Sequence, residues 1–155
     1  MFKFEKLVFG DLGWGDELLF ATLMTITVSI LSMGLGLCLA IITVWAKLIT
    51  NRITRLIANF YTTVVRGVPE LLVIYLIFFG GNSVLMGVAK LFGYNGYIEL
   101  NALTIGTIAI AFISATYSSE VIRAAYLAVN KGQVEAAKAL GLSKIQIFLR
   151  VMGPQ

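Results

Sequence analysis

Four ionisable residues border long apolar stretches of this sequence and are its main candidates for recognition chemistry. Arg66 and Glu70 stand just before one uncharged run, and Glu120 and Arg123 follow directly after another. Ionisable side chains at the edge of a membrane segment are candidates for contacting a charged solute or gating its path. Two local alternatives stand beside this. Glu120 and Arg123, three residues apart, can pair on one helix face. For Arg66 we favour extension to the lipid headgroups over substrate contact.

The residue types do not indicate catalysis. The sequence has no histidine, and its one cysteine, Cys38, lies within an apolar run. A cysteine-based metal site and a disulfide framework are therefore excluded. No GxxxxGK[ST] phosphate loop is present either. We expect no enzyme and no cofactor in this chain, so if it moves a solute uphill, the energy must come from another subunit.

The composition places the chain among integral membrane proteins. Of its 155 residues, 59% are hydrophobic and 13% are charged, and the mean hydropathy is +0.91, whereas a soluble domain is about half apolar. The net charge of +4 comes from basic residues dispersed among the loops. A nucleic-acid-binding protein gathers such residues on one face, so we expect membrane lipid, and no nucleic acid, as a partner.

Three uncharged runs predict three membrane-spanning helices, at about 18–46, 68–89 and 101–126, each near or above the roughly 20 residues that a span needs. The fold class expected is therefore an all-α integral membrane protein. Two of the runs carry small residues at every fourth position, which allows close helix packing. These residues are Ser32, Gly36 and Ala40 in the first run and Ala111, Ala115 and Ser119 in the third.

Charge fixes the expected orientation. Residues 47–67 are basic, which by the positive-inside rule places them in the cytoplasm, with an interfacial helix at about 53–66. Residues 1–17 are acidic on balance and amphipathic, so we expect the N-terminus outside, with Asp16 as the N-cap of the first span. The second span is expected to end near residues 80–82. An external loop follows at 82–100, with a short amphipathic helix at about 84–92.

Residues 130–155 are polar and basic, and they predict two short helices. Asn130 and Ser143 each precede a glutamine by three residues, as in a capping box. Gly141 lies between the two predicted helices and is the expected terminator of the first. The first helix presents Glu135 beside two small residues, Ala136 and Ala137, which a partner's groove can approach closely.

Two stretches resemble known signatures. The run EAAKALGLSKIQIFLRVMGP resembles the EAA loop of ATP-binding-cassette importer permeases, with Glu135, Ala136, Ala137 and Gly141 in the matching positions and Gly153 standing where the pattern has leucine. The run from Arg66 to Leu72 resembles the RGxPxL signature of the polar amino-acid branch, which includes opine permeases. Residues 117–133 are similar to the approach to the loop in that branch.

The resemblance implies a fold, a function and partners. Residues 18–155 would form an ABC transmembrane type-1 domain. The loop at 130–155 would dock on a cytoplasmic ATP-binding subunit. The spans would line a path for a polar or basic amino acid or opine delivered by an external substrate-binding protein. A second permease subunit, identical or different, would complete the path in the bacterial inner membrane.

The family core continues with further spans after this loop, so the resemblance implies a partial domain whose remaining core helices are missing. Two alternatives to a transporting permease stay open on the sequence. One is a truncated remnant that does not transport. The other is a small self-associating membrane protein of unrelated function, which would explain the small-residue stripes but not the two signatures.

Overall fold

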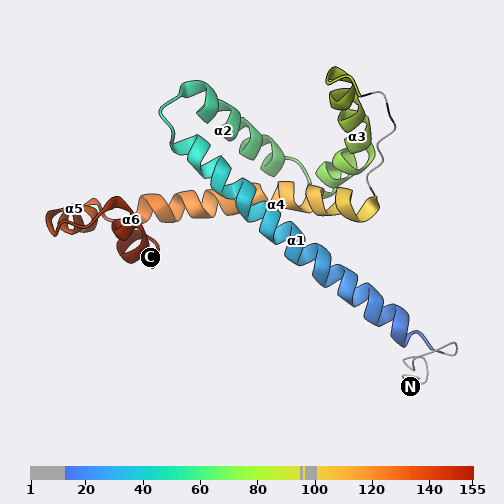
Figure 1. The fold of residues 1–155 in the computed structure, drawn as a ribbon, viewed down its shortest axis with the longest axis horizontal. Helices are drawn as coiled ribbons and strands as arrows, with labels where there is room; N and C mark the ends of the chain where they lie inside the picture. Colours follow the sequence, from blue (N-terminus) through green and yellow to red (C-terminus); the bar gives the residue numbers. More distant parts are fainter. Residues whose placement is uncertain (1–12, 95, 97–100) are drawn as a thin grey trace.

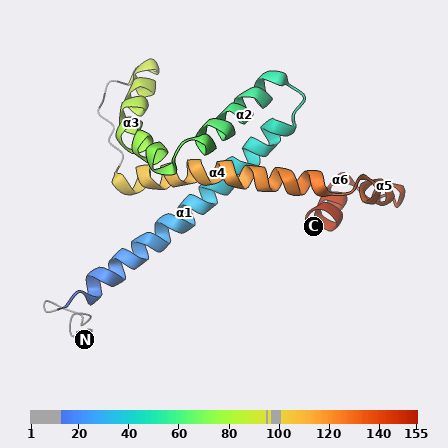
Figure 2. The ribbon, with the colours of Figure 1, turned by 180° about the vertical axis from the view of Figure 1, so that it is seen from behind.

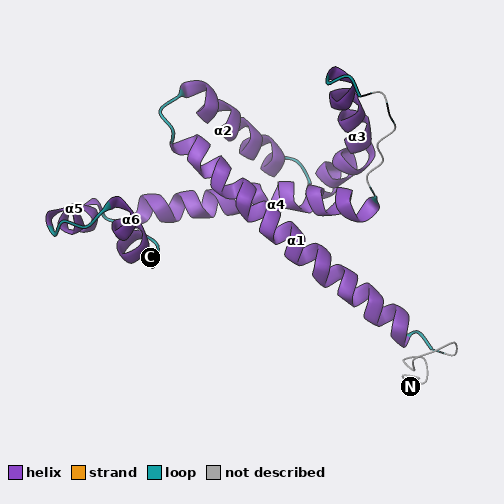
Figure 3. Cartoon of the chain, viewed as in Figure 1, coloured by secondary structure: helices purple, strands orange, loops and turns teal. Residues whose placement is uncertain are grey.

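The computed structural model describes residues 13–94, 96 and 101–155, and every element in that part of the chain is helical (Figure 3). The expected all-α class is confirmed. The order is α1 (Gly15–Leu48), α2 (Arg52–Gly67), α3 (Glu70–Leu91), α4 (Ala102–Ala128), α5 (Lys131–Ala139), α6 (Lys144–Ile147) and the π-helix η2 (Phe148–Met152).

The crossing of α1 over α4 organises the fold (Figure 1). Ser32, Gly36 and Ala40 are all buried on α1, as are Ala111 and Ala115 on α4. A β-carbon added to Gly36 would lie 3.2 Å from the backbone oxygen of Ala111. Because these side chains are small, the two backbones approach closely. The expected packing role of both small-residue stripes is therefore confirmed.

Helices α2 and α3 follow one another along α4. From the end of α1, α2 turns back toward the middle of α4, and α3 continues toward the beginning of α4 (Figure 2). Pro69 lacks the backbone N–H that a helix interior needs, and the helix is interrupted at Val68 and Pro69 before α3 begins. A small core of Val65, Val73 and Ile113 joins the three helices at this interruption.

Helices α1, α3 and α4 are long and apolar enough to cross a membrane, and they overlap the three expected spans. Their outer surfaces carry many large apolar side chains that the rest of the chain does not cover; Ile30 and Phe79, for example, are 66% and 72% exposed. In water such a surface would aggregate, whereas in a bilayer it is solvated by lipid or covered by other helices.

Two local expectations were wrong. Helix α3 continues through residues 80–82 to Leu91, because neither Gly80, Gly81 nor Asn82 prevents helix formation where neighbouring turns are apolar. The connection from α3 to α4 therefore begins later than the expected residue 82. The N-cap of α1 is Trp14, and Asp16 lies in its first turn, where a carboxylate still interacts favourably with the helix dipole. Residues 1–12, in the expected external N-terminus, lie outside the described residues, as do 97–100.

Candidate functional site

Residues 130–155, called the EAA loop below, fold as the expected helix, glycine turn and helix. Gly141 has a φ of +77°, a left-handed conformation that glycine adopts without a β-carbon clash. The Gly141 N–H donates to the Lys138 carbonyl (2.9 Å), and the Leu142 N–H donates to the Ala137 carbonyl (3.2 Å). These two bonds form a Schellman motif, which ends α5 and turns the chain toward α6.

The two N-caps of the loop differ from each other. Ser143 and Gln146 form the expected capping box, with side-chain to backbone bonds in both directions. At the start of α5, the Asn130 side chain accepts from the Gly132 N–H at 2.9 Å instead of bonding to Gln133. The short asparagine side chain favours a partner two residues on, so the expected reciprocal bond with Gln133 is not made.

The docking candidates of the EAA loop divide by exposure. Glu135, Ala136 and Gly141 are exposed, whereas Ala137 is 4% exposed. Adjacent residues of a helix do not share a face, so the two alanines cannot form one flat surface. Ala137 instead lies on the inner side of α5, which packs against α6 and η2.

Apolar side chains surround the exposed end of the EAA loop. Leu140 is 81% exposed, Ile145 is 72% exposed, and Phe148 and Leu149 are both more than half exposed. Glu135 also lines a hollow of about 350 Å³ between the end of α4 and the loop, together with Lys131 and Lys138. A charged hollow beside uncovered apolar side chains is the surface expected of a protein contact.

Arg66, Glu70 and Tyr117 lie together at the interruption between α2 and α3. The Arg66 guanidinium carbon is 5.4 Å from the centre of the Tyr117 ring, within cation–π range. Glu70 and Tyr117 line a cavity of about 250 Å³, with Ser114. Two predicted site residues, Arg66 and Glu70, are thus brought together by a tyrosine on the facing helix.

Glu120 and Arg123 form a separate cluster with Lys47, which the sequence had suggested was a cytoplasmic loop charge. Lys47 lies in the last turn of α1 with its side chain only 2% exposed, and its Nζ forms an ion pair with Glu120. Nζ also donates to the Thr62 hydroxyl at 2.6 Å. Arg123 is 3.7 Å from the second Glu120 oxygen, so the local Glu120–Arg123 pair is present.

Lys47 could have been found from the sequence. It lies seven residues after Ala40, and so continues the buried face that begins at Ser32 and Gly36. A residue on a continuous helix face is buried with that face, even where its charge suggests a loop. The expectation that Lys47 lies in a loop came from the neighbouring arginines, Arg52 and Arg55, which do lie outside α1.

A further bond joins α2 to α4. The Tyr61 hydroxyl donates to the Phe112 carbonyl at 2.5 Å, and the two rings lie 4.7 Å apart. Partial burial raises the pKa of Tyr61 to about 12, so its hydroxyl remains a donor throughout the physiological pH range.

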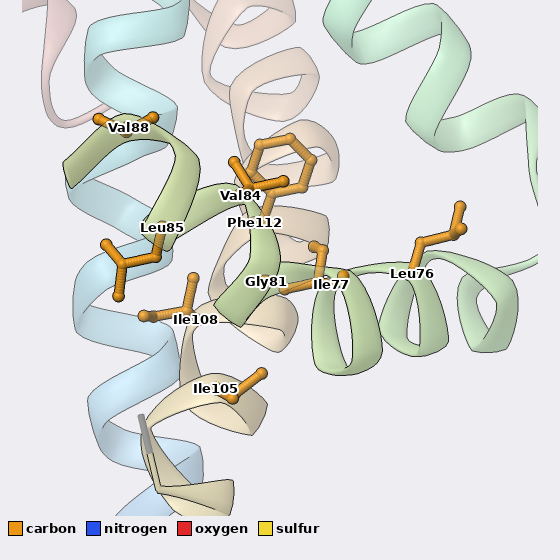
Figure 4. A pocket seen from close by; sticks show the side chains of 10 residues that line it. Leu76, Ile77, Gly81, Val84, Leu85, Val88, Ile105, Ile108 and Phe112 are labelled. Carbon is orange, nitrogen blue, oxygen red and sulfur yellow. The ribbon is translucent and has the colours of Figure 1, made fainter. Parts of the chain in front are cut away.

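A cavity of about 470 Å³ lies between α3 and α4 and is lined by apolar residues (Figure 4). Leu76, Val84 and Leu85 of α3 line it together with Ile108 and Phe112 of α4. An apolar lining leaves nothing to bond a charged amino acid, so this cavity is not a binding site for such a solute. Within the described ranges, no group of acidic or cysteine side chains could hold a metal ion.

Comparison with known proteins places this geometry in a family. The family described as "Binding-protein-dependent transport system inner membrane component" matches residues 32–155. A nopaline transport system permease of Agrobacterium fabrum is 47% identical over 150 residues, which are 96% of this chain and 64% of that protein. The histidine/lysine/arginine/ornithine permease of Escherichia coli K12 is 37% identical over 142 residues, which are 92% of this chain and 62% of that permease.

A solved structure is also similar. The crystal structure of an amino acid ABC transporter with histidines superposes with a TM-score of 0.64 at 31% identity, over 86% of this chain and 56% of the solved one. The chain thus spans somewhat less than two thirds of the relatives that it matches. These relatives are transport permeases, which disfavours a self-associating membrane protein of unrelated function. The chain belongs to the family of inner-membrane components of binding-protein-dependent transport systems, as a multi-pass membrane protein.

Proposed function

We propose that this chain belongs to the permease subunit of an ATP-binding-cassette importer for a basic amino acid or an opine. The observation that carries the proposal is the 47% identity to a nopaline permease over 150 residues. The family match over residues 32–155 includes the whole EAA loop. Octopine and histidine/lysine/arginine/ornithine permeases are also similar. The solutes named for these relatives share an α-amino-acid group, and several also carry a cationic side chain.

The EAA loop is the docking surface for the ATP-binding subunit. Its exposed carboxylate, Glu135, and its exposed apolar residues Leu140 and Ile145 supply a charged contact and an apolar contact on one short segment. Interfaces of this kind combine buried apolar anchors with a few oriented polar groups. Gly141 fixes the angle between the two helices, and Ala137 lets them pack closely.

The interruption between α2 and α3 is the place where the solute is recognised. Breaks in membrane helices expose polar backbone and side-chain groups that can bind a solute within an otherwise apolar path. Here the break brings the Glu70 carboxylate and the Arg66 guanidinium to Tyr117. A zwitterionic amino acid needs one acceptor and one donor of opposite charge, and this pair offers both.

Orientation follows from charge. Residues 47–67 and the EAA loop lie on the cytoplasmic side of the membrane, and the N-terminus lies outside. One crossing, by α1, separates the N-terminus from residues 47–67, and three crossings, by α1, α3 and α4, separate it from the EAA loop. A second permease subunit covers the apolar surfaces that α1 and α4 leave exposed, and an external binding protein delivers the solute. The family name itself describes transport that depends on a binding protein.

The proposal is tested by gene deletion and uptake. Cells that lack the gene should lose energy-dependent uptake of one labelled solute among arginine, histidine, nopaline and octopine, and should regain it when the gene is restored. Unchanged uptake of all four solutes would contradict the proposed substrate class. Retention of the binding protein and the ATP-binding subunit should be verified in the deletion strain, so that the loss is assigned to the permease.

A further inference from the structure

The ion pair between Lys47 and Glu120 joins three helices at one point. Lys47 belongs to α1, Glu120 to α4, and the Thr62 hydroxyl that completes the Lys47 contacts belongs to α2. The Lys47 side chain is 2% exposed and that of Glu120 is 29% exposed. A lysine this deeply buried is stable as a cation only with a matched partner, so the pair holds the three helices in one relative position.

The pair also lies on the side of the fold nearest the EAA loop. Only Val129 and Asn130 separate α4 from α5. Because this connection is short, a movement of α5 is transmitted directly to α4. Among the described residues, the hydrogen bonds from Ser32 of α1 and Tyr61 of α2 to α4 end at Thr107 and Phe112, further from the loop than Glu120. Lys47 is therefore well placed to carry that movement from α4 into α1 and α2.

Both oxygens of Glu120 are engaged. One pairs with Lys47 and the other lies 3.7 Å from Arg123, which leaves little capacity for a solute. Apolar side chains of similar volume would hold helices together without the cost of burying charge. A charged pair is directional instead, and its strength changes steeply when the helices rotate or separate. This property suits a contact that transmits movement between helices.

We propose that Lys47 and Glu120 are positioning residues that couple the movement of the EAA loop to α1 and α2. This inference rests on the proposed function, and it assigns Glu120 to coupling and not to the solute path. The variants K47M and E120Q should let the ATP-binding subunit hydrolyse ATP while less solute is moved. The conservative variants K47R and E120D should retain most of the coupling.

The test uses the assembled importer reconstituted in liposomes with its binding protein. ATP hydrolysis and solute uptake are measured together, and their ratio is the readout, because a merely structural role would lower both in proportion. We expect K47M and E120Q to raise the ATP consumed per solute about fivefold or more, the lower end of typical coupling between sites. K90M, which changes an exposed lysine near the end of α3, is the matched control and should leave the ratio unchanged.

Three outcomes are decisive. A wild-type importer without ATP-dependent uptake would contradict the proposed function and this inference with it. A transporting wild type whose K47M and E120Q variants keep its ratio would overturn the inference alone. Two double variants distinguish loss of the ion pair from misfolding. The reversed pair K47E/E120K should restore coupling, whereas the neutral pair K47M/E120Q should not. Failure of every variant to yield folded importer would assign the pair to stability and also overturn the inference.

Discussion

Gly36 of α1 lies against Ala111 of α4 so closely that a β-carbon on Gly36 would be 3.2 Å from the Ala111 carbonyl oxygen and 3.3 Å from the Ser114 β-carbon. The crossing of these two helices therefore depends on the absence of a side chain at one position. Backbone contacts of this kind cannot relax by rotating a neighbouring side chain.

The variant G36L should separate α1 from α4. Overpacking a tight contact costs about 1–3 kcal/mol, so the melting temperature of the purified chain in detergent should fall. Gly34 has open space where its β-carbon would be, so G34L is the matched control and should melt at or above the wild-type temperature. Equal melting of the two variants would mean that α1 and α4 are not packed in this register.

Gly141 should tolerate asparagine better than alanine. Its φ of +77° costs an alanine about 1–2 kcal/mol, whereas asparagine visits this region more readily. We expect G141A to reorient α5 relative to α6 and to weaken the capture of the ATP-binding subunit in a pull-down. G141N should bind at close to the wild-type level. If both variants bind alike, the turn conformation does not matter for docking.

The orientation of the chain can be measured with reporter fusions. Alkaline phosphatase, which is active only outside the cytoplasm, should be active when fused after Tyr94 and inactive when fused after Thr50 or Leu140. A cytoplasmic fluorescent reporter at the same three positions should give the opposite pattern. Activity after Leu140 would place the EAA loop outside and would rule out its docking on a cytoplasmic ATPase.

Glu70 should affect solute recognition if it contacts the solute. Hydrogen bonds to charged groups contribute about 1.5–3 kcal/mol, so E70Q should raise the KM of ATP-driven uptake about tenfold or more for a basic solute. E17Q, at an exposed position in the first turn of α1, is the control and should leave KM unchanged. A wild-type KM for E70Q would remove Glu70 from the recognition site.

The features of this structure that depend on local sequence patterns were predicted better than the features that depend on tertiary contacts. The uncharged runs located α1, α3 and α4, and the glycine and capping signals located the turn at Gly141 and the start of α6 at Ser143. Small residues at every fourth position correctly marked the faces on which α1 and α4 pack. Each of these features depends on neighbours within a few turns of the same helix, which the sequence displays directly.

The clusters at the candidate site depended on contacts between helices. Lys47 pairs with Glu120 across 73 residues, and Tyr117 joins Arg66 to Glu70 from the opposite helix. No spacing in the sequence relates Lys47 to Glu120, or Tyr117 to Arg66 and Glu70. The exposure of Ala136 and the burial of Ala137 likewise depend on how α5 packs against α6 and η2.

Docking of the EAA loop on the ATP-binding subunit is the central claim, and E135K tests it most directly. Glu135 is exposed, so reversing its charge should leave membrane insertion and melting unchanged. K90E, an exposed charge reversal near the end of α3, is the control. Affinity purification from membranes should recover the ATP-binding subunit with wild type and K90E but not with E135K. Full recovery with E135K would contradict the account.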